Sequence, residues 1–109
     1  MVKKTDTHSK KVRILRARFG CSQEALAKII GVSHKTIGRW EASESRPNQL
    51  AMEKIDGLQN IAVKMSAVIK PGHEQEWLDS PLPALGGRTP FETLGHGYPG
   101  IQKVLKALR

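Results

Sequence analysis

The fold of this 109-residue chain is decided by residues 22–41, which read Ser22-Gln-Glu-Ala-Leu-Ala-Lys-Ile-Ile-Gly-Val-Ser-His-Lys-Thr-Ile-Gly-Arg-Trp-Glu41. Two short helical patterns lie in this stretch, over residues 23–30 and from His34 to about Ala42, and each follows a serine suited to cap a helix N-terminus. Gly31 ends the first helix and turns the chain within a few residues. Two short helices joined by a turn that contains glycine indicate a helix-turn-helix. Their apolar positions are Leu26, Ile29 and Ile30 in the first helix and Ile37 and Trp40 in the second.

The polar face of the second helix is the candidate recognition surface. Ala27, in the first helix, is small and lets the second helix cross it closely. His34, Lys35, Gly38 and Arg39 then project outward, where a recognition helix meets base edges in the major groove. Arg39 can bind guanine O6 and N7 together, which is worth about 1–3 kcal/mol of base discrimination. We expect Lys35 either to read a base or to hold a phosphate, and His34 either to donate to a base edge or to cover surface.

Residues 22–41, followed by Arg46-Pro47, resemble the helix-turn-helix of the Cro/CI-type (Xre-like) repressors. The resemblance covers roughly residues 9–56. It implies that Trp40 anchors the core and that Glu41 makes hydrogen bonds at the helix end. The DNA contacts that it implies are base readout by His34, Lys35 and Arg39, backbone contacts by Ser33 and Thr36, a phosphate or base contact by Gln23, and a phosphate contact by Arg46.

The segment before this stretch completes the N-terminal half. Residues 1–8 are polar and basic and are expected to form a loose arm. A helix is predicted from Ser9, because Val12, Leu15 and Phe19 recur on one helical face. Gly20 is placed to end that helix, since glycine enters the left-handed region freely.

The charge of the chain is high and unevenly placed. The formal net charge is +8 and the pI is near 10, and residues 1–56 carry 12 Lys and Arg against 6 Asp and Glu, whereas residues 57–109 carry 6 against 4. An excess of cations in one half is typical of a surface that binds a polyanion. Charge alone does not decide between this interpretation and a solvated surface. The helix-turn-helix spacing favours binding to nucleic acid.

After the helix-turn-helix, Pro47 and Asn48 precede a fourth helix, with Asn48 as a candidate cap. Its apolar residues between Ile55 and Ile69 follow a 3-4-3-4 spacing, which makes a seam suited to helix–helix packing. The seam is either a dimer interface or internal core. Gly57 either kinks this helix, so that two helices result, or lies within a single one. We place a domain boundary here, with a DNA-binding domain at residues 1–56 and a second helical domain at residues 57–109.

The remainder of the chain is predicted as short helices separated by loops rich in proline and glycine. Pro71-Gly72 ends the fourth helix, and Thr89 with Glu92 forms a capping-box pattern with proline at the first helical position. The predicted segments are a helix over 73–79, irregular chain over 80–88, a helix over 90–94, a loop over 95–100 and a final helix over 101–108.

The stretch from Trp77 to Leu94 contains Leu85-Gly-Gly-Arg-Thr-Pro90 and is similar to the C-terminal toxin-binding domain of the Xre/MbcA/ParS-type antitoxins. The resemblance covers roughly residues 58–109. It implies a RES-domain toxin, which consumes NAD, as the partner, with the C-terminal region obstructing its active site. An alternative for Arg88 is a structural role in a tight turn, where it caps a carbonyl or pairs with Asp79. The toxin contacts implied by the resemblance are Trp77, Leu85, Gly86, Gly87, Arg88, Thr89 and Pro90.

Several functional classes are disfavoured by what the sequence lacks. Cys21 is the one cysteine, so no internal disulfide is possible and a reducing cytoplasm is the expected compartment. The four histidines are scattered, and no zinc or catalytic constellation is present. The Gly-Gly-Arg sequence lacks the lysine and the preceding strand of a phosphate-binding loop. We therefore expect no enzymatic activity, cofactor, metal, membrane span or signal peptide.

Together these patterns predict an all-α protein, a Cro/CI-type helix-turn-helix bundle followed by a small helical toxin-binding domain. The expected function is that of a DNA-binding antitoxin that neutralises a RES-type toxin and represses its own operon. The expected partners are an inverted-repeat operator in double-stranded DNA, the toxin and a second copy of the chain. One alternative is a phage- or mobile-element-type repressor whose C-terminal half only dimerises. Another is an interaction module that no longer binds DNA.

Overall fold

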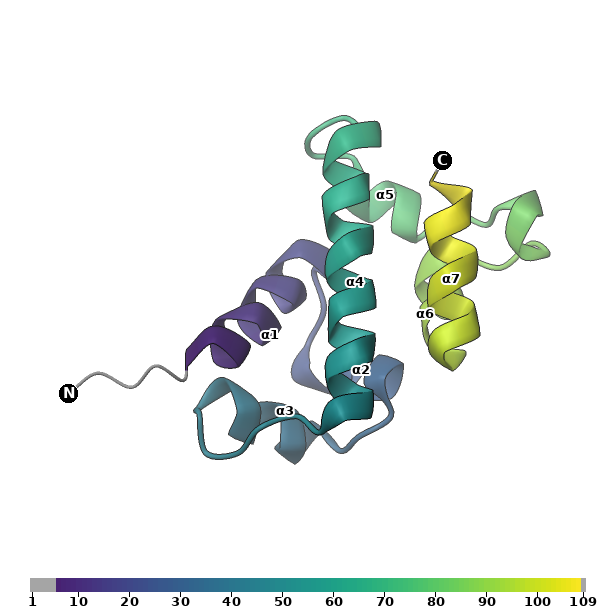
Figure 1. Cartoon of the computed structure of the whole chain (residues 1–109). Coiled ribbons are helices and arrows are strands. Elements are labelled where there is room, and N and C mark those ends of the chain that lie inside the picture. Colours follow the sequence, from purple (N-terminus) through teal and green to yellow (C-terminus); the bar gives the residue numbers. More distant parts are fainter. Residues whose placement is uncertain (1–5, 109) are drawn as a thin grey trace.

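The computed structural model describes residues 6–108, which form helices joined by short loops (Figure 1). This confirms the predicted all-α fold class. The helices are α1 (Asp6–Phe19), α2 (Gln23–Ile30), α3 (His34–Glu41), α4 (Gln49–Val68), α5 (Glu74–Leu78), the 3-10 turn η1 (Pro83–Leu85), α6 (Pro90–Leu94) and α7 (Gly97–Ala107).

The helix starts follow from side chains that cap them. Ser22, Ser33 and Asn48 each accept a hydrogen bond from the backbone N–H three residues later, at the start of α2, α3 and α4. At α6, Thr89 accepts from the backbone of Glu92, and the Glu92 carboxylate accepts from the backbone N–H of Thr89. All four caps were predicted, because capping depends on local sequence alone.

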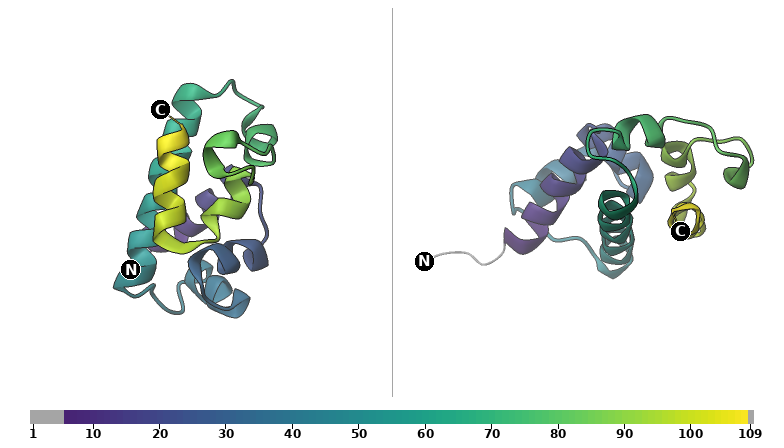
Figure 2. Two further views of the ribbon diagram at one scale, coloured as in Figure 1. Left: turned by 90° about the vertical axis from the view of Figure 1, so that its right-hand side faces the viewer. Right: turned by 90° about the horizontal axis from the view of Figure 1, so that it is seen from above.

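Helix α4 occupies the centre of the molecule, with α1 on one side and α7 on the other (Figure 2, right). Leu58 and Met65 are completely buried, so the seam predicted along this helix is internal core. Gly57 lies in an unbroken helix, and its role is close packing rather than a kink. A Cβ at this position would lie 3.0 Å from Ile101 Cγ2 of α7. The whole buried part of the seam comprises Ile55, Leu58, Ala62 and Met65, with Ile69 partly buried beside it.

Polar contacts also fasten the helix-turn-helix to α4. Lys54 Nζ donates to the carbonyl of Ile30 at 2.8 Å, at the end of α2. Arg18, near the end of α1, donates to the carbonyl of Ala62 at 3.0 Å and to Ser66. These contacts lie on both sides of residue 57, so one continuous helix joins the N-terminal and C-terminal halves.

The structure corrects the predicted start of the first helix and the predicted form of segment 80–88. Helix α1 begins at Asp6, three residues before the predicted Ser9, and residues 1–5 of the predicted arm lie outside the described residues. The early turn is held by tertiary contacts that local sequence does not reveal, since His8 Nε2 lies 3.1 Å from the Ser45 carbonyl oxygen. The segment 80–88, predicted to be irregular, contains the 3-10 turn η1.

The predicted loop over 95–100 is wrong from residue 97 onward, because α7 begins at Gly97. Pro99 is compatible with this start, since the N–H groups of a first helical turn have no intrahelical acceptor. Gly100 explains why the turn packs so closely. A Cβ there would lie 2.0 Å from the Thr93 carbonyl oxygen of α6, so only glycine fits.

Candidate nucleic-acid interface and C-terminal pocket

Helix α3 presents the predicted base readers to solvent. His34, Lys35 and Arg39 are all exposed, and the opposite face of the helix is buried through Ile37 and Trp40. In Figure 1 this helix lies at the lower end of the molecule, away from α7. The C-terminal half therefore leaves the cationic face of α3 open.

The other residues predicted to contact DNA differ in exposure and in hydrogen bonding. Ser33 is exposed, and its hydroxyl caps α3 and lies 2.9 Å from the hydroxyl of half-buried Thr36. Arg46 is exposed in the loop after α3. Gln23 is half-buried, and its Nε2 donates to Glu41 at 2.9 Å. The side chain of Gln23 thus joins α2 to α3, and one of its amide hydrogens is already engaged.

Glu41 holds three helices together at the back of the recognition helix. Arg16 of α1 donates from Nε to Oε2 at 2.6 Å and from Nη2 to Oε1 at 3.1 Å. The backbone carbonyl of Glu41 accepts from Ser9 Oγ and from Arg13 Nη2, each at 2.6 Å. With Gln23 these contacts fix the end of α3 against α1 and α2, and so set the angle at which α3 is presented.

The surroundings of Glu41 and Arg16 favour the charged forms of both side chains. Burial opposes ionisation of Glu41, but hydrogen bonds from Arg16 and Gln23 outweigh it and lower the pKa of the carboxyl group. The same contact, the hydrogen bond to Glu41, raises the pKa of Arg16. Sequence reasoning expected Glu41 to make hydrogen bonds at the helix end but missed Arg16 as its partner. The separation of 25 residues leaves no local signal for that pair.

The predicted toxin contacts divide into exposed and buried residues. Gly86, Gly87 and Arg88 are exposed on the turn after η1, with φ of +70° and +83° at the two glycines. Leu85 and Pro90 are buried, and so belong to the core that supports this turn. Trp77 and Thr89 are half-buried.

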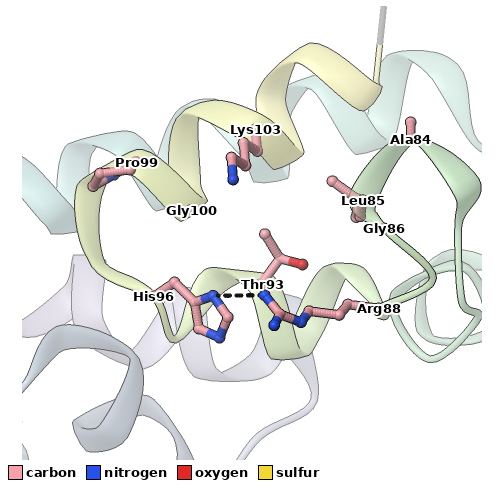
Figure 3. Close-up of a pocket in the computed structure, with 9 residues that line it drawn as sticks. All are labelled: Ala84, Leu85, Gly86, Arg88, Thr93, His96, Pro99, Gly100 and Lys103. Atoms are coloured by element: carbon pink, nitrogen blue, oxygen red, sulfur yellow. Dashed lines mark hydrogen bonds between the residues drawn. The ribbon is translucent and has the colours of Figure 1, made fainter.

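Arg88 faces a pocket of about 440 Å³ between the η1 turn, the end of α6 and the first turns of α7 (Figure 3). One of its Nη atoms lies 3.4 Å from His96 Nδ1, and the predicted pairing with Asp79 is absent. Asp79 instead accepts from Gln75 Nε2 at 3.4 Å. The lining includes two cationic side chains, Arg88 and Lys103, and the imidazole of His96.

Other candidate reactive groups lack a site. Burial raises the pKa of the half-buried Cys21 thiol, although the nearby Arg16 opposes this shift. Within residues 6–108, no group of three His, Cys, Asp or Glu side chains is placed to hold a metal ion. Within the same range, none of the helices has the length and apolar character that a bilayer crossing requires.

Two protein families match separate parts of this chain. The helix-turn-helix family matches residues 12–57. The family of antitoxin Xre/MbcA/ParS C-terminal toxin-binding domains matches residues 71–109. The first match covers α1 to α3 and the first half of α4, and the second covers α5 to α7 with the η1 turn.

Individual proteins are similar to the chain over different lengths. The mycobacterial cidal antitoxin MbcA of Mycobacterium tuberculosis is 26% identical over 88 residues, which are 81% of this chain and 76% of MbcA. The uncharacterised HTH-type transcriptional regulator YgzD of Bacillus subtilis is 44% identical over 45 residues, 41% of this chain and 68% of YgzD. The crystal structure of the M. tuberculosis MbcT–MbcA toxin–antitoxin complex contains a chain of the same fold. Its TM-score is 0.72 at 24% identity, over 94% of this chain and 90% of that one.

Proposed function

We propose that each half of this chain has its own function. The chain belongs to the helix-turn-helix antitoxins that carry an Xre/MbcA/ParS C-terminal toxin-binding domain. Residues 1–56 bind an inverted-repeat operator in double-stranded DNA and repress the chain's own operon. Residues 57–109 bind a RES-type toxin and keep it inactive. The chain acts in the cytoplasm as a homodimer and has no enzymatic activity of its own.

The DNA task rests on the exposed face of α3. His34, Lys35 and Arg39 stand on one short helix whose other face is fixed in the core, which is the arrangement that a recognition helix needs. Gln23, Ser33, Thr36 and Arg46 are proposed to contact the DNA around them. Two such helices in a dimer would read half-sites one helical turn apart, roughly 34 Å.

The toxin task rests on the turn after η1. Gly86, Gly87 and Arg88 are exposed on a segment that projects at the right-hand side of Figure 1. Trp77, Leu85, Thr89 and Pro90 support that turn from inside the C-terminal half or from its edge. The complex formed by the similar antitoxin MbcA with its toxin MbcT supports a toxin as the partner of this half.

The single observation that carries the proposal is that the two surfaces lie apart on the molecule. The cationic face of α3 and the turn after η1 do not cover each other, so one chain can present both (Figure 1). Residues of one surface can therefore be substituted without altering the other surface.

Growth rescue and operator binding test the proposal together. The RES-type toxin proposed as its partner is co-expressed in a bacterial host with each variant of the full-length chain. The Lys35→Ala/Arg39→Ala variant is expected to restore growth but to lose binding to the DNA upstream of the gene. The Arg88→Glu variant is expected to bind that DNA but to rescue poorly, and Lys106→Glu, at an exposed site on α7, serves as its control. A wild-type chain that neither rescues growth nor binds the toxin would refute the antitoxin task.

A deletion of residues 77–109 is a poorer test than these substitutions. It removes Ile101 and Val104, which are fully buried and belong to the helix that packs on α4. The loss of rescue would then report the loss of core packing as well as the loss of a toxin-binding surface.

A further inference from the structure

The pocket beside Arg88 has a cationic side without a carboxylate to balance it. Arg88 reaches along one side toward His96, and Lys103 turns into the same hollow from α7 (Figure 3). No Asp or Glu belongs to the lining. Within residues 6–108, Lys103 makes no ion pair and no side-chain hydrogen bond. Two cationic side chains that face one cavity without a counter-ion indicate a site for an anionic group.

The carboxylate of the acidic residue on α6, Glu92, already accepts a hydrogen bond within its own helix start. Glu92 uses its carboxylate to accept from the backbone N–H of Thr89, at 3.0 Å, in the capping box of α6. The hydroxyl of Thr93, at the base of the pocket, donates to the carbonyl of Thr89 at 2.9 Å. Among residues 6–108, no carboxylate pairs with Arg88 or Lys103, which leaves their positive charge available to an anionic group.

The turn after η1 and the apolar walls of the pocket favour a carboxylate over a phosphate. Backbone N–H groups are the usual ligands of phosphate at glycine-rich turns and helix starts. Here Gly86 N–H donates to Pro83 and Gly87 N–H donates to Leu82, so neither is available. Ala84, Leu85 and Pro99 line the pocket together with the cationic side chains. Apolar walls beside a guanidinium suit a carboxylate on a short aliphatic stem, which the Arg fork can bind through two hydrogen bonds.

We propose that this pocket receives the carboxylate of an Asp or Glu side chain of the partner toxin, held between Arg88 and Lys103. The proposal rests on the toxin-binding function proposed above and names the chemical group that this part of the surface selects. The aliphatic stem of that side chain lies against Leu85, and His96 holds the guanidinium of Arg88 at the edge of the cavity.

Titration of the full-length chain with small probes tests the pocket without any toxin. The probes are N-acetyl-Leu-Glu-amide, the matched neutral N-acetyl-Leu-Gln-amide and inorganic phosphate, followed by amide NMR of the labelled protein. We expect the Glu peptide to shift the amides of Gly86, Arg88 and Gly100 in a saturable way, and the Gln peptide to leave them unchanged. Equal shifts by both peptides, shifts by phosphate alone, or no shift at all would each overturn the proposal.

Matched substitutions connect the pocket to the toxin. Arg88→Gln and Lys103→Gln should each weaken binding of both the Glu peptide and the toxin by about fivefold or more, because each removes one charge-assisted contact. Lys106→Gln, on the same helix outside the pocket, should change neither affinity. Amide spectra that stay native away from the pocket show that each variant is folded.

The two proposals fail in different ways in this experiment. If the wild-type chain binds the toxin and both pocket variants bind it equally well, the pocket assignment is wrong while the toxin-binding function stands. If the wild-type chain does not bind the toxin, the proposed function fails. The pocket proposal, which names a toxin side chain, is then overturned with it, and the peptide titration shows whether the cavity binds carboxylates at all.

Discussion

Arg16 of α1 makes two hydrogen bonds with Glu41 at the end of α3, at 2.6 and 3.1 Å, across 25 residues of sequence. The side chain of Glu41 is only 10% exposed and that of Arg16 is 31% exposed. This pair, together with Gln23, is the polar contact that orients the recognition helix.

Glu41→Ala is expected to destabilise the fold by about 2 kcal/mol, because it leaves Arg16 and Gln23 without their acceptor. That figure is below the range for fully buried pairs, since Arg16 is partly exposed. Urea unfolding of both proteins measures the difference. The control is Asp56→Asn, whose pair with Lys11 has side chains 57% and 30% exposed and should cost less than about 0.5 kcal/mol. Equal losses in the two variants would contradict a special role for Glu41.

The stability of the wild-type chain should fall with acid more steeply than that of Glu41→Gln. The folded-state pKa of Glu41 lies below the ordinary value of 4.5, so the unfolded chain takes up the proton first as the pH falls. The stabilisation is complete above the unfolded-state pKa and is lost as the pH drops through the folded-state pKa. Melting temperatures recorded from pH 7 to pH 3 measure this loss. Parallel curves for the two proteins would show that Glu41 does not contribute.

Arg39→Ala is expected to weaken binding to the operator by about 5- to 150-fold, the loss of one good base contact. If Lys35 holds a phosphate, Lys35→Ala should reduce the slope of log affinity against log salt by about 1. Fluorescence anisotropy with DNA from upstream of the gene, at several salt concentrations, measures both effects. Lys64→Ala, an exposed lysine on α4, is the control for net charge. Affinity that is unchanged in Arg39→Ala at every salt concentration would favour a module that no longer binds DNA.

Gly100→Ala should destabilise the chain by about 1–3 kcal/mol, the usual cost of forcing a methyl group into a packed site. The added Cβ would lie 2.0 Å from the Thr93 carbonyl oxygen, so α6 and α7 have to separate. Gly95→Ala is the matched control in the same connection, because its Cβ would lie 3.4 Å from the nearest backbone oxygen and its φ is negative. Thermal melting of the two variants decides the point, and similar melting temperatures would argue against the close approach.

Local signals in the sequence were enough to predict most helices. The caps at Ser22, Ser33, Asn48 and Thr89 were predicted because each depends on residues three positions apart. The exposure of Lys35 and Arg39 follows from helical spacing once Ile37 and Trp40 are assigned to the core.

Features that depend on distant residues were not predicted. Arg16 gave no local sign of its partner Glu41, and the spacing of the α4 seam fitted a dimer interface as well as internal core, which burial shows it to be. Leu85 and Pro90 belong to a motif that the family resemblance assigns to partner contact, yet burial places them beneath the turn rather than on it. The helical start at Gly97 depends on Gly100 lying against Thr93, a contact that no periodicity reveals.

Helix α4 runs unbroken from Gln49 to Val68, and it packs on α1 and α2 as well as on α7. A shared central helix limits how far α3 and the turn after η1 can move relative to each other. If the chain binds both partners as proposed, a toxin held by that turn would therefore lie within a narrow range of distances from the DNA. Whether the chain and its toxin can occupy one operator together would then depend on the size of the toxin and on the spacing of the half-sites.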